Sequence, residues 1–283
     1  MKIVFFGSSK YSAIAAQIIQ EKLGLSLVVT HSDKPAGRAR KMIPSPLKYF
    51  AQKNKLPYLT FNDLNQEAIF AITKHHPDFL VVADYGKILP KALLDLPRFT
   101  ALNVHHSLLP KYRGPTPAPA VILAGDKKTG VTIIKMTEKV DAGDILAQEE
   151  YELKDDETTD SLLTQLNTQG GKLLIKVVKD YVAGSIRPQK QNESQATYTH
   201  RLTKEDGQID LENPPNPQTF DRMVRAFYPW PGTWCRLMVN SKWLIVKFLP
   251  GNLIQPEGKR PMSITEFKNG YPELFNQLSK LII

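Results

Sequence analysis

An amide and an imidazole stand two positions apart in the segment NVHHSLLP, which begins at Asn103. Residues 100–105 have the β-favouring composition of a short strand, and the Leu109-Pro110 break follows them. Side chains at i and i+2 share one face of a strand, so Asn103 and His105 are expected to point the same way. Ligands of open parallel sheets bind at the C-terminal ends of the strands, where this pair lies. An amide and an imidazole aimed at one spot are reagents for carbonyl chemistry.

Two neighbouring features favour a functional site over an ordinary satisfied turn. The segment SLLPKYRGPTPAP that follows is irregular and rich in proline, as loops that frame pockets are. Further along, residues 129–136 and 145–151 are predicted to pair as a hairpin, and the acidic turn VDAGD between them carries Asp141. Gly143 gives that turn the flexibility it needs.

Strand and helix patterns alternate through the first half of the chain. Continuous apolar runs predict buried strands, and apolar residues at helical spacing predict amphipathic helices. The expected strands are residues 2–6, 25–30, 57–61 and 78–85, and the expected helices are residues 11–22, 46–53, 64–74, 90–96 and 118–123. This alternation predicts an α/β fold with a Rossmann-like, mostly parallel sheet. The first turn, GSS, lacks the G-x-G-x-x-G spacing, so a dinucleotide site is not expected.

The second half of the chain predicts a change of architecture. Residues 157–183 have helical apolar spacing over a length that suits one long helix or two, and residues 185–200 have the composition of a linker. We therefore expect a catalytic domain at 1–184, a linker at 185–200 and a second domain at 201–283. The tryptophans at 230, 234 and 243 suit core and turn positions better than a base-stacking platform. About three strands are countable here, whereas an OB barrel needs five, so a small, reduced OB-like β domain is expected.

Composition narrows the class of protein. The chain has 283 residues, 42% of them apolar, and its charge of +9 with a pI near 9.4 favours a polyanionic partner. The single cysteine, Cys235, excludes an intramolecular disulfide and a multi-cysteine metal site, and we expect no metal. No stretch has the length of a membrane span or the pattern of a signal peptide. We expect a cytoplasmic, monomeric enzyme with no membrane contact.

A basic segment, HSDKPAGRARKMIPSPLK, occupies residues 31–48. Its three prolines are expected to keep it out of any helix or sheet, so that its cations face solvent. Such a charge run is ordinarily only a solvated surface.

The motifs NVHHSLLPKYRG, TGVTIIKM and VDAGDIL, in this order, resemble the formyltransferases that use 10-formyltetrahydrofolate. The basic segment matches at DKPAGR and PSPLK, and AFYPWPGTW resembles a block of the second domain. These matches are typical of the members whose acceptor is the free amino group of initiator methionyl-tRNA. The resemblance implies formyl transfer from the folate to that tRNA, with 10-formyltetrahydrofolate as donor substrate.

The resemblance also implies roles for individual residues. An amine attacks the formyl carbon through a tetrahedral oxyanion, to which the amide of Asn103 and a protonated His105 would donate hydrogen bonds. Asp141, the one carboxylate that matches the family, would orient His105 or a water and relay protons. The residues expected against the folate are Tyr85, Gly86, Ile88, Ser107, Leu108, Leu109 and Pro110. Those expected against tRNA are Lys34, Arg38, Arg40 and Lys41, of which Arg38 is the strongest candidate.

The chain departs from the family at three places. Asp84 stands where small residues are common, His106 stands where glycine is frequent, and the second domain is shortened after Phe248. Other functions therefore remain to be tested. The same Asn, His and Asp would serve an N-formyltransferase acting on a nucleotide-linked amino sugar or on glycinamide ribonucleotide. A non-catalytic tRNA-binding relative is a second alternative, and a formate-releasing hydrolase or dehydrogenase would need a further thiol-bearing domain or an altered loop.

Overall fold

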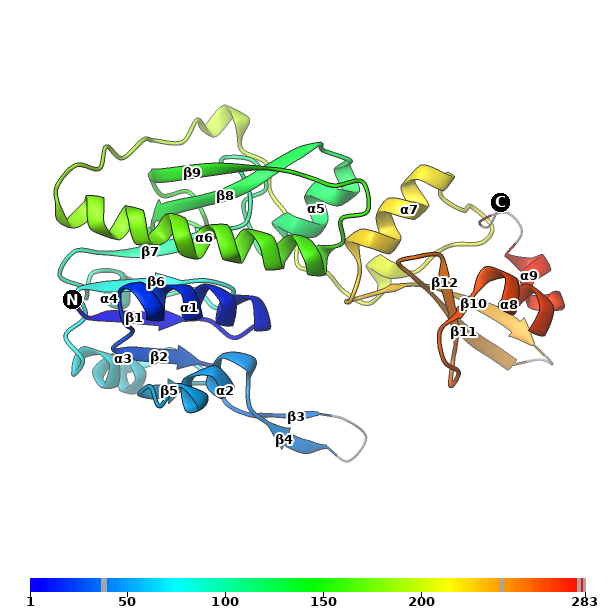
Figure 1. The fold of residues 1–283 in the computed structure, drawn as a ribbon, viewed down its shortest axis with the longest axis horizontal. Helices are drawn as coiled ribbons and strands as arrows, with labels where there is room; N and C mark the ends of the chain where they lie inside the picture. The colour runs from blue at the N-terminus through cyan, green and yellow to red at the C-terminus, as the bar shows by residue number, and fades with distance from the viewer. Residues whose placement is uncertain (37–39, 240–241, 279–280, 282–283) are drawn as a thin grey trace. The chain divides into compact units, whose positions relative to one another are not determined.

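A computed structural model describes residues 1–36, 40–239, 242–278 and 281. The chain divides into two compact units (Figure 1). The first comprises residues 1–115, 128–152 and 163–199, and the second comprises residues 116–127, 153–162 and 200–283. None of the described helices has both the length and the apolar character needed to cross a membrane.

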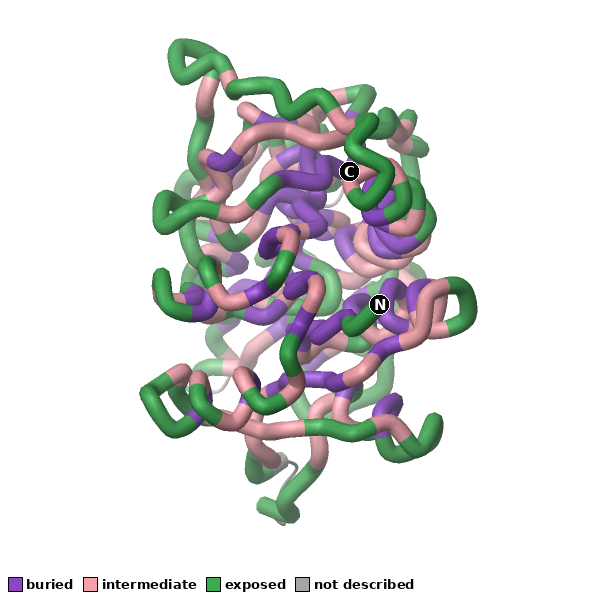
Figure 2. The backbone as a smooth tube through the Cα atoms, turned by 90° about the vertical axis from the view of Figure 1, so that its left-hand side faces the viewer, coloured by how far each residue is buried: buried purple, intermediate pink, exposed green. Residues whose placement is uncertain are grey.

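The first unit is built on a seven-stranded sheet in the order β5-β2-β1-β6-β7-β8-β9. The strands from β5 to β7 pair in parallel, whereas β8 pairs antiparallel with both β7 and β9. The continuous apolar runs form buried strands, while the connecting turns are exposed (Figure 2). The bounds are β1 Ile3–Phe6, β2 Leu27–Thr30, β5 Tyr58–Thr60, β6 Phe79–Val82, β7 Thr100–His105, β8 Lys128–Lys135 and β9 Ile145–Glu152.

Helices cover both faces of this sheet, as in a doubly wound fold. Buried residues of α1, α2 and α6 pack on one face with the side chains of Ile3, Phe5 and Val81. Residues of α3 and α4 cover the other face with Val4 and Phe6. The Rossmann-like, mostly parallel sheet predicted from the sequence is confirmed. The helices are α1 Lys10–Lys22, α2 Pro46–Lys53, α3 Gln66–Thr73, α4 Lys91–Leu94 and α6 Thr159–Val182.

The starts of these helices follow from local sequence. The side chains of Ser9, Ser45 and Asn65 each accept a hydrogen bond from a backbone N–H in the first turn of α1, α2 and α3, respectively. Pro46 stands at the first position of α2, where a missing N–H has no consequence. The apolar spacing of residues 157–183 produces one continuous helix, α6.

The basic segment does join a sheet, which corrects the expectation from its prolines. Strand β3, Lys34–Ala36, pairs antiparallel with β4, Lys41–Ile43, as a two-stranded ribbon. Both strands of such a ribbon are edge strands, and an edge strand tolerates proline because its missing N–H can face solvent. Pro35 therefore lies inside β3 opposite Met42.

The second unit contains a four-stranded antiparallel sheet in the order β10-β11-β12-β13, one strand more than counted from the sequence. One face of this sheet and the short helices α8 and α9 enclose a core that includes Cys235, Val246, Phe248, Phe267 and Leu274. Helices α5 and α7 pack on each other in the same unit. The bounds are α5 Pro117–Ala124, α7 Pro217–Ala226, β10 Thr233–Val239, β11 Lys242–Leu249, β12 Leu253–Pro256, β13 Met262–Ser263, α8 Ile264–Gly270 and α9 Pro272–Gln277.

The segment expected to be a linker lies along the first unit as far as Thr199. Gln189 pairs antiparallel with Ile145 at the start of β9 through two backbone hydrogen bonds of 2.8 and 2.9 Å. Tyr198 pairs in parallel with Arg113. A short 3₁₀ turn, Glu193–Gln195, lies between these two bridges.

Candidate active site

Strand β7 presents the amide and the imidazole at its C-terminal end. Its neighbours are β6 on one side and β8 on the other, and both hold it in register over Leu102 and Asn103. Asn103 and His105 are separated by two positions and lie on the same face. Asn103 is half-buried, while only 4% of His105 is exposed.

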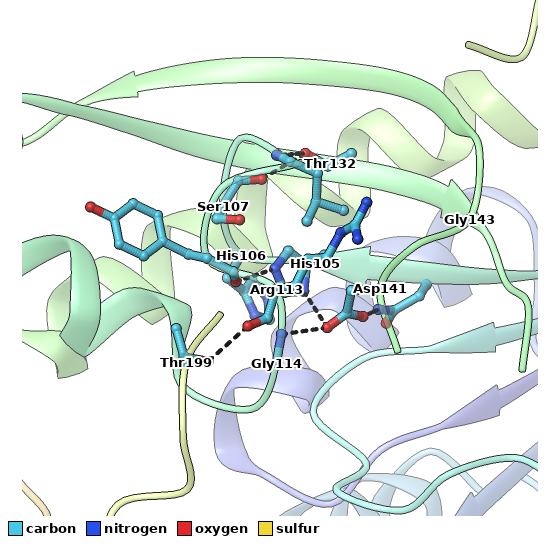
Figure 3. A network of polar contacts seen from close by, with 12 residues as sticks. His105, His106, Ser107, Arg113, Gly114, Thr132, Asp141, Gly143 and Thr199 are labelled. Carbon is cyan, nitrogen blue, oxygen red and sulfur yellow. Dashed lines mark hydrogen bonds and ion pairs between the residues drawn. The ribbon is translucent and has the colours of Figure 1, made fainter. Parts of the chain in front are cut away.

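The turn between β8 and β9 brings a carboxylate to this pair (Figure 3). Asp141 Oδ1 accepts a hydrogen bond of 3.1 Å from Asn103 Nδ2, and Asp141 Oδ2 accepts one of 2.8 Å from the backbone N–H of Gly114. The Nδ1 atom of His105 lies 3.6 Å from Asp141 Oδ2. Of the three residues that the sequence analysis singled out for catalysis, Asp141 is therefore within contact distance of both Asn103 and His105.

The hydrogen bonds of His105 define its protonation. Its Nε2 lies 3.0 Å from the carbonyl oxygen of Tyr112, and a carbonyl can only accept, so Nε2 carries the proton. Burial lowers the pKa of His105, and the nearby Asp141 carboxylate opposes that shift. The imidazole is therefore neutral at pH 7, and its Nδ1 lone pair faces the carboxylate. A neutral ring with this tautomer can take a proton at Nδ1 but has no free N–H to offer.

A turn that the sequence analysis did not single out holds both titratable groups. Tyr112 supplies the carbonyl that fixes His105, and Gly114 supplies the N–H that fixes Asp141. Gly114 has φ +109°, and a Cβ at this position would lie 2.8 Å from the carbonyl oxygen of Thr199. The motif KYRG contained a partial indication, because glycine in an irregular segment is the usual residue where the chain needs a positive φ or a close backbone approach.

The first group of expected folate residues follows β6. The ring of Tyr85 is buried in the core against Phe6 and stacks on His31, and its backbone carbonyl oxygen lies 2.7 Å from His31 Nε2, so neither the ring nor this carbonyl is open to a ligand. Burial raises the pKa of Tyr85 to about 12. Gly86 and Ile88 lie on the surface, and 73% of Ile88 is exposed.

The second group follows β7. The hydroxyl of Ser107 donates to the carbonyl of Lys111 at 2.6 Å, and the carbonyl of Ser107 accepts from the hydroxyl of Thr132 at 2.6 Å. The N–H of Leu109 donates to the same hydroxyl at 3.2 Å. Ser107 and Leu109 are buried, whereas Leu108 and Pro110 are half-buried. The hydroxyl of Ser107 therefore shapes the turn, and the half-buried pair is the part that a ligand can reach.

The two residues that depart from the family pattern contact each other. His106 Nδ1 lies 3.4 Å from Asp84 Oδ1, and Asp84 Oδ2 accepts a hydrogen bond of 2.9 Å from the Ser9 hydroxyl. The side chain of His106 is buried, and its Nε2 has no partner among the described residues. Alternation along the strand thus directs His106 toward Asp84 and His105 toward Asp141.

Three of the four residues expected to contact tRNA lie on or beside the ribbon. Lys34, Arg40 and Lys41 are exposed. The fourth, Arg38, lies outside the described residues. These cations therefore lie on a regular two-stranded ribbon, whereas the sequence predicted an irregular loop.

Two cavities lie away from these groups. One of about 530 Å³ lies by the N-terminal ends of the parallel strands and is lined by Lys2, His76, Asp78 and Arg98, among others. The second, of about 200 Å³, lies in the second unit beside Arg222. Neither cavity is lined by a residue expected to contact folate. Among the described residues, no group of three or more His, Cys, Asp or Glu side chains could hold a metal ion.

Comparison with known proteins agrees with this arrangement. Residues 1–178 match the formyl transferase family, and residues 201–253 match the C-terminal domain of formyl transferases. Among solved structures, a 4-N formyltransferase from Francisella tularensis has the same fold, with a TM-score of 0.68 and 20% sequence identity. The similarity covers 88% of this chain and 97% of that one. The sheet, its polar cluster and the two domain matches define a formyl transferase.

Relatives with higher sequence identity show to which group of formyl transferases the chain belongs. A methionyl-tRNA formyltransferase of a Geobacillus species is 40% identical over 95% of this chain and 94% of its own length. Another, from Herpetosiphon aurantiacus, is 35% identical over 97% of this chain and 99% of its own length. The chain belongs to the methionyl-tRNA formyltransferase family.

Proposed function

We propose that this protein transfers the formyl group of 10-formyltetrahydrofolate to the free amino group of methionyl-tRNA. The observation that carries the proposal is the cluster of Asn103, His105 and Asp141, in which an amide donor, an imidazole lone pair and a carboxylate meet at the end of β7. The names of the relatives at 35% and 40% identity support the choice of acceptor. Formyl-tetrahydrofolate is the substrate of the family.

The first step is loss of a proton from the ammonium of the acceptor. The Nδ1 lone pair of His105 takes this proton, and Asp141 stabilises the imidazolium that results. The amine then attacks the formyl carbon, and an oxyanion forms. Nδ1–H is now a donor, so the protonated His105 expected from the sequence arises during the reaction rather than in the resting enzyme.

The second step is collapse of the tetrahedral intermediate. The amide of Asn103 donates to the oxyanion, and one such donor contributes about 2.7 to 4 kcal/mol of transition-state stabilisation. The bond between the formyl carbon and N10 breaks, and N10 takes the proton held at Nδ1 of His105. The former ammonium loses its second proton to solvent through Asp141. The products are a formamide and tetrahydrofolate, and no covalent enzyme intermediate forms.

The donor is held by the two segments that flank this cluster. Gly86 and Ile88 are exposed after β6, and Leu108 and Pro110 are half-buried after β7, whereas Tyr85 itself is buried. The apolar side chains of Ile88 and Leu108 suit the ring system of a pterin, and the exposed backbone groups of Gly86 suit its polar edge.

The β3–β4 ribbon binds the acceptor tRNA. Lys34, Arg40 and Lys41 are exposed cations on this element, and phosphate contacts of this kind give affinity and orientation. The total charge of +9 is in keeping with a polyanionic partner.

A single-turnover assay tests the proposed function. The purified chain is mixed with formyl-labelled 10-formyltetrahydrofolate and either methionyl-tRNA or a nucleotide-linked amino sugar. We expect label in N-formylmethionine after mild deacylation of the tRNA and no label in the sugar. Transfer to the sugar alone would establish the alternative acceptor, and binding of tRNA without any transfer would establish a non-catalytic relative.

A further inference from the structure

Arg113 is a buried cation whose hydrogen bonds are all directed at the segment 191–198. Only 1% of the residue is exposed. Its Nε and Nη2 donate to Gln191 Oε1 at 3.1 and 2.8 Å, and its Nη1 and Nη2 donate to the two carboxylate oxygens of Glu193 at 2.9 and 2.8 Å. The remaining Nη1 proton is donated to the hydroxyl of Tyr198 at 3.1 Å. These contacts use all five donors of the guanidinium, so Arg113 has none left for a substrate.

Gln191 connects this arginine to the catalytic turn. Its Nε2 donates to the carbonyl oxygens of Asp141 and Gly143, each at 2.7 Å. Its Oε1 accepts both bonds from Arg113. The two sets of partners fix the orientation of the amide, because only the nitrogen can donate to carbonyls and only the oxygen can accept from a guanidinium.

The same segment also holds the turn that contacts His105 and Asp141. The backbone N–H of Arg113 donates to the carbonyl of Thr197 at 2.8 Å, and the carbonyl of Arg113 accepts from the N–H of Thr199 at 2.7 Å. The residues on either side of Arg113 are the ones that bond His105 and Asp141 (Figure 3). Residues 191–199 therefore hold the catalytic groups from two directions.

Asp141 needs such support because its backbone is strained. Its φ of 49° lies in the left-handed region, which is unfavourable for a residue other than glycine. The surrounding turn, residues 137–144, contains few regular backbone hydrogen bonds of its own, and the amide of Gln191 bonds two of its carbonyls. Loss of these bonds would free the turn to relax away from His105.

We infer that Gln191, oriented by Arg113, is a positioning residue that holds Asp141 against His105. This inference rests on the proposed function, since it assumes that Asp141 takes part in formyl transfer. Gln191 touches the backbone of the catalytic turn and not the reacting atoms. A displacement of about 1 Å at a catalytic group is enough to reduce a rate on the order of 100-fold.

The test is the near-isosteric substitution Gln191→Glu. A carboxylate in this place still accepts from Arg113 but cannot donate to the carbonyls of Asp141 and Gly143. We expect kcat to fall by about 10- to 100-fold while KM for methionyl-tRNA stays within about twofold. The matched control is Gln195→Glu, the same change at an exposed residue of the same segment, which we expect to leave kcat unchanged.

Amide hydrogen exchange of residues 137–144 supplies a readout that does not depend on activity. We expect faster exchange in Gln191→Glu and no change in Gln195→Glu. If the native enzyme formylates methionyl-tRNA and Gln191→Glu keeps its kcat or raises only KM, the inference is wrong. If the native enzyme transfers no formyl group, the proposed function is wrong, and the exchange data alone decide whether Gln191 holds the turn. Unchanged exchange in that case overturns the inference as well.

Discussion

Asn103 Nδ2 donates a hydrogen bond of 3.1 Å to Asp141 Oδ1, across 38 residues of sequence. The bond joins the end of β7 to the turn after β8, and the antiparallel pairing of these strands is what brings the two side chains together. An amide engaged by a carboxylate is pre-oriented, so Asn103 needs little rearrangement to donate to a developing oxyanion.

Replacement of Asp141 by asparagine tests whether formyl transfer needs the negative charge of this side chain, because the two side chains have nearly the same shape. The substitution keeps the shape of the side chain and one acceptor oxygen, but it replaces the other carboxylate oxygen with an N–H donor and removes the charge that stabilises protonated His105. We expect kcat/KM to fall by about 100- to 10,000-fold, the range for loss of acid–base assistance. The melting temperature should fall as well, because one of the two N–H groups that donate to Asp141 loses its acceptor. The control is Asp144→Asn three residues away, which should stay within about twofold of the native enzyme. Activity of Asp141→Asn near the native level would remove Asp141 from the mechanism.

The lowered pKa of His105 should appear in the pH dependence of stability. Burial is the main cause of the shift, and the charge of His106 adds to it, whereas Asp141, Asp84 and the Tyr112 carbonyl oppose it. The folded pKa lies below the unfolded value of about 6.5, so the unfolded state binds more protons and stability decreases as pH falls through and below this value. Urea unfolding from pH 7.5 to 5.5 should show a smaller decrease for His105→Gln than for the native protein. Equal slopes for the two proteins would contradict a buried neutral imidazole.

Local sequence patterns predicted most of the fold, because the apolar periodicity of a helix or strand can be recognised within a short stretch of sequence. Strand β7 and helix α2 begin and end at the predicted residues, since an apolar strand core and a Ser-Pro start define them. The β3–β4 ribbon was not predicted, because the rule that excludes proline from sheets does not hold at an edge. The partners of Arg113 lie 78 to 85 residues away, and no periodicity reveals that a linker glutamine meets a buried arginine.

His106 and Asp84 should behave as one unit in a double-mutant cycle. Their side chains lie 3.4 Å apart, and each departs from the residue usual in the family. Asp84→Ala leaves the buried His106 without its carboxylate. We therefore expect Asp84→Ala to lower the free energy of unfolding more in the native protein than in a His106→Gly background. The coupling energy from urea unfolding should be about 0.5 to 3 kcal/mol. A coupling energy near zero would mean that the two departures are independent.

Cations of the ribbon should control tRNA affinity and its dependence on salt. Arg40→Ala and Lys41→Ala remove exposed charges from one end of the ribbon. We expect each to raise KM for methionyl-tRNA, to leave kcat nearly unchanged, and to lower the slope of log affinity against log salt by about 1. Lys22→Ala, which removes an exposed cation at the end of α1, is the matched control and should change neither quantity. If the dependence of tRNA affinity on salt were the same in the ribbon variants and the native enzyme, the ribbon would be only a solvated surface with no contact to tRNA.

A methyl group at Gly143 should displace the catalytic turn. A Cβ at this position would lie 1.8 Å from the backbone carbonyl oxygen of Lys135, and a backbone group cannot move aside as a flexible side chain can. The turn must therefore shift, and the carbonyl of Gly143 that accepts from Gln191 shifts with it. We expect Gly143→Ala to lower the free energy of unfolding by about 1 to 3 kcal/mol and kcat by at least about 10-fold. Gly270→Ala, where a Cβ meets nothing within 4 Å, is the control and should preserve both values. Native-like kcat in Gly143→Ala would show that formyl transfer tolerates movement of Asp141, against the proposed mechanism.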